Sequence, residues 1–536
     1  MLTGSPVKAI ILFALPIMAS SMLQFNYSLV DNIIVGRYVS EAALAAVGCV
    51  GPINSFIIGA ALGLTTGFTI PVAHAFGEGD RRKLSHFAGS SIVIAFIIGC
   101  VIMVTSHLIS PVLLDLVRTP DEIKSIASSY INILYYGIPV QMLSNNFTAI
   151  SRATGESRMP LVFFSVSVVA NFLMDLLFVK YLQLGVEGAA VATLISHIIA
   201  CALNGIYVLR FNKNVKLLKS DFRPELRTVF YQIRLGIPVS LQFTVTSVGS
   251  MCLQSVVNSF GTNVIAGFTA AGRVEGITNI PMSGLGVATQ TFVGQNYGAG
   301  NYDRIKDGVK KIFILDLCVS VAMSIILYFA AEPVITLFGD NMNAEIMAAA
   351  KRYILAIAEC YSLVAILFVM RNTLQGMGFT YANSVAGVGE FFGRITIAFV
   401  LTPMLCGLIP LYLLRWRLNV ITMGDDEARS MGVDPRKIRL WIAVASTLVT
   451  ASAVSVSGMI GWVGLVIPHM MRRLVGSDYR FLMPASMLGG GIFLLIVDNV
   501  SRNATTAGIP IGILTAFIGA PFFLWLITGK GDHYEH

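Results

Sequence analysis

The stretch MLQFNYSLVDNIIVG, residues Met22–Gly36, decides how the rest of the chain is interpreted. It lies in an apolar run that begins near Ala9, and it holds one acid, Asp31, with no basic residue nearer than Arg37. A lone carboxylate in a bilayer core costs roughly 2.5–3.5 kcal/mol on insertion scales, so such a residue usually faces a bundle interior or a water-filled path. The helices up to residue 403 are therefore expected to form a scaffold around Asp31.

The composition is that of an all-α integral membrane protein. Of the 536 residues 55% are hydrophobic and only 12% are charged, whereas a soluble domain carries about 25% charged residues. The formal charge is +8, but Lys and Arg gather in the short connections 76–86, 210–227 and 297–311. This positive-inside pattern predicts a multi-pass protein of the plasma (inner) membrane, with a cytoplasmic N-terminus and the lipid bilayer as its partner, and not a nucleic-acid binder.

The sequence contains no cofactor or enzyme motif. The seven cysteines stand singly in apolar segments, without the spacing of a metal site. No GxxxxGK[ST] phosphate-binding loop occurs, so the chain has no nucleotide site of its own. We therefore expect a transporter and not an enzyme, with no bound cofactor.

An internal repeat organises the chain up to residue 403. When the sequence is shifted by 221 residues, Gly51 falls on Gly272 and the connection GEGDRRK (77–83) falls on GAGNYDR (298–304). Two such halves are typical of transporters that carry their substrate path between the halves. The alternative is chance coincidence in a glycine-rich membrane sequence.

Several separated stretches resemble the MATE family of multidrug and toxin extrusion antiporters. These stretches are LPIMASSMLQFNYSLVDNIIVG (15–36), SRATGESRMP (151–160), VVANFLMD (168–175) and FVGQNYGAGNYDR (292–304). The likeness covers residues 5–403 and implies two six-helix bundles, here 1–210 and 211–405. It also implies that a drug-like substrate, often cationic and amphipathic, leaves the cell as H⁺ or Na⁺ enters. The second bundle lacks its sixth helix, because residues 406–431 do not repeat the first-half helix 185–210.

The resemblance assigns cation coupling to Asp31, Asn171 and Asp175. Asn171 and Asp175 are four residues apart, which places them on one helix face where they could meet Asp31. Burial and a neighbouring like charge both favour the neutral form of a carboxyl group, so the cluster could take up a proton or hold Na⁺ between its oxygens. The alternative is an ordinary interhelical hydrogen bond, worth about 0.6 kcal/mol in membranes.

Other polar residues in apolar runs are weaker candidates for the substrate pathway. A local ion pair with Arg273 would explain one of them, Glu275, equally well. The candidates are Gln24, Asn26, Tyr27, Asn145, Glu275 and Glu390.

From residue 407 onward the sequence resembles a different family. LIPLYLLRWRLNVITMGDDEARSMGVD (408–434), GMIGWVGLVIPHMMRRLVGSDYR (458–480) and IPIGILTAFIGAPFFLWL (509–526) are similar to the FecCD-type permeases of iron-siderophore and cobalamin ABC importers. The likeness covers about 407–530 and implies about four permease-type helices in a segment 406–536. In such permeases the stretch GDDEARSMG is a short cytoplasmic helix pair that presses on an ATPase subunit, although an ordinary charged loop is the alternative. The residues of this coupling segment are Gly424, Asp425, Asp426, Glu427, Arg429 and Gly432.

Three functions remain open from the sequence. The first is a MATE-type antiporter. The second is a permease subunit that takes its missing helices from another chain and works with an ATPase and a solute-binding protein. The third is a non-functional fusion of two neighbouring genes.

The junction between the two resemblances poses a topological conflict. The eleven residues Met404–Leu414 reach about 16 Å as a helix, which is roughly half of a 30 Å bilayer core. We expect a helix break at Pro403, Gly407 and Pro410, which would keep the basic segment that follows in the cytoplasm. The alternative is one long tilted helix over 384–416.

Overall fold

The structure, a computed structural model, describes residues 1–116, 119–336, 343–457 and 463–503. These residues form two compact units, Met1–Phe392 and Gly393–His536, and each unit is described by itself. Ten described helices are long and apolar enough to cross a membrane. The expected all-helical, multi-span membrane fold is therefore confirmed, since a helix satisfies every backbone group without water.

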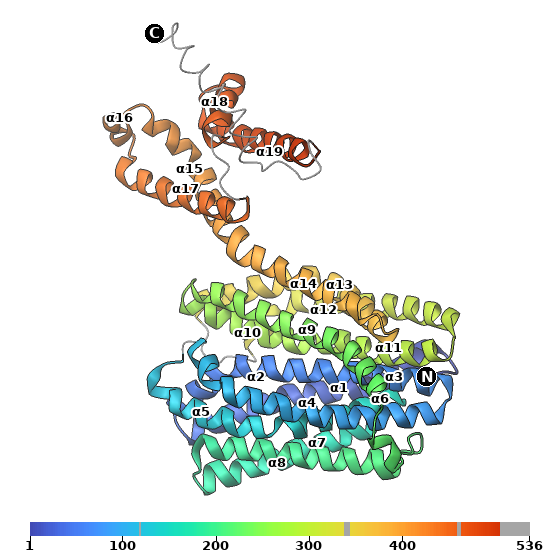
Figure 1. Ribbon diagram of the computed structural model, residues 1–536. Helices are drawn as coiled ribbons and strands as arrows, with labels where there is room; N and C mark the ends of the chain where they lie inside the picture. Colours follow the sequence, from blue (N-terminus) through green and yellow to red (C-terminus); the bar gives the residue numbers. More distant parts are fainter. Residues whose placement is uncertain (117–118, 337–342, 458–462, 504–536) are drawn as a thin grey trace. The chain divides into compact units, whose positions relative to one another are not determined.

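The first unit contains two helical lobes, which lie one above the other in Figure 1. The first lobe consists of α1 (Pro6–Tyr38), α2 (Glu41–Phe68), α3 (Ile70–Glu78), α4 (Arg81–Leu116), α5 (Asp121–Tyr136), α6 (Ile138–Ala153), α7 (Arg158–Asp175) and α8 (Gly185–Ile206). The second lobe consists of α9 (Leu226–Asn258), α10 (Thr262–Thr278), α11 (Ile280–Gly298), α12 (Tyr302–Thr336), α13 (Ala344–Gly376) and α14 (Thr380–Ile395). Proline lies in the first turn of α3, α6 and α11, where its missing N–H removes no helical hydrogen bond.

The helix boundaries follow the internal repeat. Helix α4 shifted by 221 residues covers 302–337, and α12 runs over Tyr302–Thr336. A π-helical turn follows α7 at Leu176–Tyr181, and a second one follows α14 at Thr396–Leu401. The repeat is therefore structural and not a chance coincidence of glycines.

The two lobes are joined most closely where α2 crosses α9. A Cβ atom on Gly63 would lie 2.5 Å from the Cα atom of Ser240, and Gly67 meets Gly236 in the next turn. The Ser240 hydroxyl donates to the Ala60 carbonyl at 3.0 Å. Small residues allow two membrane helices to approach this closely, because lipid offers no hydrophobic gain for larger side chains to exploit.

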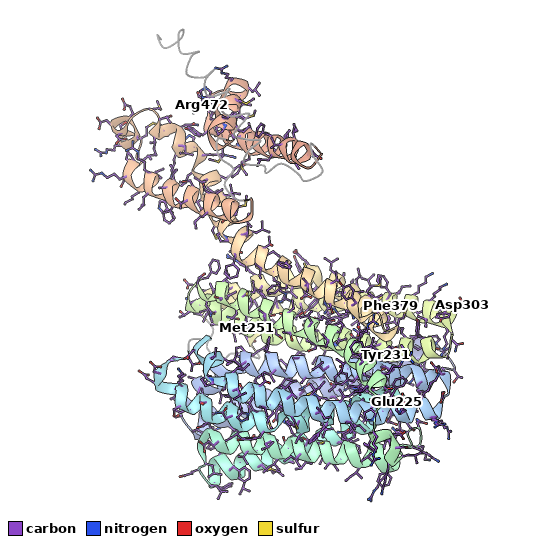
Figure 2. The ribbon with its side chains drawn as sticks, in the orientation of Figure 1. Glu225, Tyr231, Met251, Asp303, Phe379 and Arg472 are labelled. Atoms are coloured by element: carbon purple, nitrogen blue, oxygen red, sulfur yellow. The ribbon has the colours of Figure 1, made fainter. Side chains whose placement is uncertain are left out.

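The basic connections lie at one end of the helices. Figure 2 labels Glu225 and Tyr231 at the start of α9, Asp303 at the start of α12 and Phe379 before α14, all at the end opposite Met251 of α9. Arg304 binds the N-terminal segment at this end, because its guanidinium donates to the carbonyls of Met1 at 3.1 Å, Thr3 at 3.1 Å and Gly4 at 2.8 Å.

The second unit has its own small core. Its described helices are α15 (Thr402–Ile421), α16 (Asp425–Ser430), α17 (Pro435–Ser457), α18 (Val463–Val475) and α19 (Tyr479–Asn503). Val420, Ala428, Val433 and Ile438 are buried together around α16. A backbone hydrogen bond from Arg480 and a side-chain bond from Asn419 hold the pKa of the Asp478 carboxyl below its usual value. The stretch 509–526 and the beginning of 458–480 lie outside the described residues.

The expected break at the junction is not formed. Residues Thr380–Ile421 form one helical stretch of 42 residues, about 63 Å at 1.5 Å per residue. Pro403 lies in the first turn of α15, directly after the π-helical turn, and the Thr402 hydroxyl donates to the Ile397 carbonyl at 2.7 Å. The wider π-helical turn directly before Pro403 accommodates a residue without an N–H donor, and the helix also continues through Pro410. The prediction of a short half-helix was therefore wrong, and the long helix is observed.

Candidate functional site

The structure brings Asp31 of α1 together with Asn171 and Asp175 of α7. The Asn171 amide is assigned with its nitrogen facing the carboxyl groups, because the opposite orientation would set its oxygen against acceptors only. In this orientation Asn171 Nδ2 donates to Asp31 Oδ1 at 3.1 Å and to Asp175 Oδ2 at 3.1 Å. One amide therefore bridges two carboxyl groups from two different helices.

The cluster is largely hidden from solvent. Asn171 and Asp175 are each 1% exposed, while Asp31 is partly buried. Asp175 Oδ1 has no hydrogen-bond partner among the described residues. The Tyr27 hydroxyl next to the cluster donates to Thr193 Oγ1 at 3.3 Å. A buried oxygen without a partner is costly, and binding of a cation would relieve that cost.

The geometry of the cluster defines its chemistry. The carboxyl groups of Asp31 and Asp175 accept from the same amide nitrogen, each at 3.1 Å, which sets two like charges close together when both groups are ionised. A carboxylate only accepts hydrogen bonds, so a bond between the two groups requires at least one proton. The cluster is thus arranged to hold a proton, and its oxygens together form an acceptor set for a cation.

The weaker candidates on α1 precede Asp31 in the same helix. Asn26 and Tyr27 line a cavity of about 280 Å³ together with Asn171. Gln24 is exposed on the same helix. The structure therefore places the first-helix candidates near the carboxyl groups, although their role in a substrate pathway remains a prediction.

The remaining candidates are distributed over other helices. Asn145 is partly buried on α6. Glu275 of α10 accepts a hydrogen bond from the Tyr353 hydroxyl at 2.7 Å. Glu390 of α14 forms an ion pair with Arg371 Nη2 at 3.0 Å. Of these acids only Glu390 is bonded to a residue of the central cavity described next.

A cavity of about 310 Å³ lies between the two lobes. Arg152 of α6 and Arg371 of α13 line it from opposite lobes, and Gln290 of α11 lies on the same wall as Arg371. Phe243 and Phe368 provide an apolar part of the lining. The cavity therefore combines apolar surface with a few polar groups, as small-molecule sites do.

Interlobe hydrogen bonds close the structure at the end that carries the basic connections. Gln295 Nε2 of α11 donates to the Ala153 carbonyl at 2.8 Å. His74 Nε2 of α3 lies 2.8 Å from the Gly376 carbonyl. These contacts hold the ends of α3 and α6 against the ends of α11 and α13, next to the cavity.

Sequence reasoning missed three charged residues inside the membrane part. Arg152 and Arg371 stand near the ends of α6 and α13, where a basic residue normally sets topology, so the sequence alone did not distinguish them. Asp316 of α12 is 0% exposed, and neither carboxyl oxygen has a hydrogen-bond partner in the described chain. Its signal, a lone acid in an apolar run, is the same as that of Asp31.

The coupling segment forms the short helix α16. Gly424 at its start has φ +129° and Gly432 beyond its end has φ +77°, conformations that favour glycine. Asp425 accepts two hydrogen bonds from Arg439 at 3.1 and 2.5 Å. Asp426, Glu427 and Arg429 are exposed, so the segment presents charged side chains on an ordered helix.

The structure has the features of a membrane transporter: two repeated helical lobes, a carboxyl cluster in one lobe and a cavity between the lobes. The chain belongs to the MatE family, whose sequence profile matches residues 16–177 and 238–400. Members of this family are cation-coupled antiporters. The profile of the FecCD transport family matches residues 354–529, so the second resemblance is confirmed as a C-terminal permease segment that overlaps the MatE match.

Individual relatives agree with both assignments. The chain is 27% identical over 407 residues to the "Probable multidrug resistance protein YoeA" of Bacillus subtilis, covering 74% of this chain and 87% of the relative. It is 46% identical over 121 residues to the "Probable iron chelatin transport system permease protein" of Helicobacter pylori, covering 23% of this chain and 37% of that relative. The chain thus spans about a third of the length of that permease relative.

A solved structure shows the same fold. The outward-facing conformation of a multidrug resistance MATE family transporter of the MOP superfamily matches with a TM-score of 0.68 and 23% identity. The match covers 84% of this chain and 95% of that chain. At this identity the likeness establishes the fold alone.

Proposed function

We propose that the MatE part of this chain exports drug-like organic compounds in exchange for H⁺ or Na⁺. The observation that carries the proposal is the Asn171 amide, which bridges the carboxyl groups of Asp31 and Asp175 inside a membrane-spanning lobe. The similarity to probable multidrug resistance proteins supports export of such compounds. The bound cation and the substrate would occupy different places, the cluster and the central cavity.

The orientation of Asn171 favours a proton as the coupling ion. Its nitrogen faces the carboxyl groups, so in this orientation its oxygen is turned away from the cluster. A metal cation such as Na⁺ needs oxygen ligands, whereas a proton needs only the paired carboxyl oxygens of Asp31 and Asp175. Proton uptake therefore requires no rearrangement of the amide, whereas Na⁺ in this orientation would take its ligands from the carboxyl oxygens without the amide oxygen.

The charge distribution supports a cytoplasmic N-terminus in the plasma membrane. The N-terminal segment is bound by Arg304, which lies in the basic connection that follows α11. The connections at this end carry most of the loop Lys and Arg residues, including Arg81, Arg82 and Lys83. Loops of this kind remain on the cytoplasmic side.

The energy source of transport tests this proposal. The purified full-length chain is reconstituted in vesicles, and the movement of fluorescent dyes is followed under a pH gradient, under a Na⁺ gradient, or with ATP alone. The membrane potential supplies about 2.3 kcal/mol per charge per 100 mV, so one of the two ion gradients is expected to drive dye export. Export with ATP and no ion gradient would contradict antiport.

A second candidate function rests on α16. The exposed charges of Asp426, Glu427 and Arg429 on an ordered helix support docking of an ATPase subunit, since FecCD permeases pair with ABC ATPases. Residues 1–353 lie outside the match to the FecCD family, so we propose docking at α16 and not import. To test docking, the full-length chain is immobilised and retention of a FecCD-type ATPase is measured. We expect the wild-type chain to retain the ATPase and Glu427→Lys to lose it. Equal retention by the wild-type chain and by Glu427→Lys would exclude α16 as the docking site.

A further inference from the structure

The charges that line the central cavity are of one sign. Among the described residues of its lining, Arg152 and Arg371 are charged and no Asp or Glu occurs. A positive charge inside the membrane part is expensive unless it is paired. The positive charge of the lining therefore bears on the charge of the compound that the cavity accepts.

The two arginines differ in how they are neutralised. Arg371 Nη2 is paired with Glu390 Oε2 at 3.0 Å, and that pair is mostly buried. Arg152 has no ion pair in the described part of the chain, and its Nε is buried without a hydrogen-bond partner. Arg371 Nε is also buried without one. After the Glu390 pair is subtracted, one full positive charge, that of Arg152, remains in the cavity lining.

The guanidinium group of Arg152 favours an acid group on the ligand. Guanidinium presents N–H donors in a rigid fork that matches carboxylate and phosphate oxygens. The rest of the lining includes Leu62, Phe243 and Phe368, which offer apolar and aromatic surface to the body of a ligand. A cation placed in the same cavity would face Arg152 without an acid among the lining residues to balance it.

We infer that the central cavity binds organic anions, with the acid group of the ligand on Arg152 and Arg371 and its apolar part on the phenylalanines. The ligand class is an amphipathic compound that carries a carboxylate, sulfonate or phosphate. This inference rests on the proposed export function, because it names the class of substrate that would be exported. It differs from the cationic class that the family resemblance implies.

Binding of two dyes of opposite charge tests the inference. The purified full-length chain in detergent is titrated with 5-carboxyfluorescein, an anion, and with rhodamine 6G, a cation of similar ring size, and fluorescence anisotropy is recorded. The anionic dye is expected to bind at least about tenfold more tightly, as one charge-assisted hydrogen-bonded contact is worth about that factor. Equal or tighter binding of rhodamine 6G to the wild-type chain would overturn the inference without any variant.

Variants then locate the site. Arg152→Gln is expected to weaken carboxyfluorescein binding about tenfold and Arg152→Lys less, because lysine keeps the charge but loses the fork. Arg158→Gln, which removes an exposed arginine at the start of α7 outside the cavity lining, is the matched control and should bind like wild type. Equal affinities of Arg152→Gln and Arg158→Gln, in variants with wild-type melting temperatures, would overturn the assignment to Arg152.

Two further arms separate this inference from related outcomes. Asp31→Asn should retain carboxyfluorescein binding even where export is lost, so a failure of coupling and a failure of anion binding are distinguishable. Added phosphatidylglycerol is compared with phosphatidylcholine as a competitor. Competition by neither lipid supports a soluble anion, whereas displacement by phosphatidylglycerol alone would overturn the soluble anion in favour of a lipid phosphate group.

Discussion

Asp31 Oδ1 on α1 and Asp175 Oδ2 on α7 each lie 3.1 Å from the same amide nitrogen, that of Asn171. The two acids are separated by 144 positions in the sequence, and α1 packs against α7 to bring them together. In the second lobe, the positions 221 residues further on are Cys252 and Thr396. The carboxyl pair is therefore confined to one lobe, and the repeat is symmetric in its helices but not in its charges.

Removal of the bridging amide should weaken coupling. Asn171→Leu keeps a side chain of similar size but takes away both N–H donors, each worth about 1.5–3 kcal/mol when the acceptor is charged. We expect ion-driven export to fall at least about tenfold, measured as initial dye efflux from vesicles. Asn132→Leu is the control, because the Asn132 amide donates to Ser128 within α5 at 3.3 Å, outside the cluster, and this variant should export at nearly the wild-type rate. Wild-type export by Asn171→Leu would show that the bridge has no part in coupling.

A methyl group at the α2–α9 crossing should destabilise the first unit. Gly63→Ala would place its Cβ 2.5 Å from the Cα atom of Ser240, and overpacking of this kind costs about 1–3 kcal/mol. Gly48→Ala in the same helix is the control, because its Cβ meets no atom within 4 Å. Thermal unfolding in detergent should show a lower Tm for Gly63→Ala only. If Gly63→Ala and Gly48→Ala have the same Tm, the close crossing is not required for stability.

The fold could be predicted from two physical signals in the sequence. Apolar runs long enough to span a bilayer identify the helices, and the coincidence of Gly51 with Gly272 reveals the repeat, because loops and close contacts both need small residues. The carboxyl cluster could also be predicted from the sequence, since a lone Asp31 in an apolar run is costly and Asn171 and Asp175 share a helix face.

The cavity arginines and the continuous helix at the junction could not be predicted from the sequence. Arg152 and Arg371 lie at helix ends, where positive charge usually sets topology, so only the packing of the lobes reveals that they line a cavity. The break expected at Pro403 is not formed, because a π-helical turn directly before it accommodates the proline within a continuous helix. Asp316 gave the same signal as Asp31 and was overlooked.

Cysteine labelling tests the topology of the junction. The unbroken helix over Thr380–Ile421 would carry Asp425 and Asp434 to the side opposite the basic connections, whereas Arg415, Arg417 and the basic residues near Asp434 resist translocation. We expect the charges to decide, so single cysteines at Asp425 and Asp434 should react with an impermeant maleimide only after cells are permeabilised. A cysteine at Asp80 in a basic connection should behave in the same way, whereas one at Ser259 after α9 should react in intact cells. All four are made in a chain without its native cysteines. Labelling at Asp425 in intact cells would place the second unit's basic segment outside.

The most direct test of coupling at the carboxyl pair compares two neutralised aspartates. Asp31→Asn and Asp316→Asn each remove one acid from a membrane helix, but only Asp31 belongs to the bridged cluster. Dye export from vesicles is measured under the ion gradient that drives the wild-type chain, with equal amounts of protein inserted. The account predicts that Asp31→Asn reduces export to the level of empty vesicles while Asp316→Asn exports like wild type. Export by Asp31→Asn at the wild-type rate would contradict it.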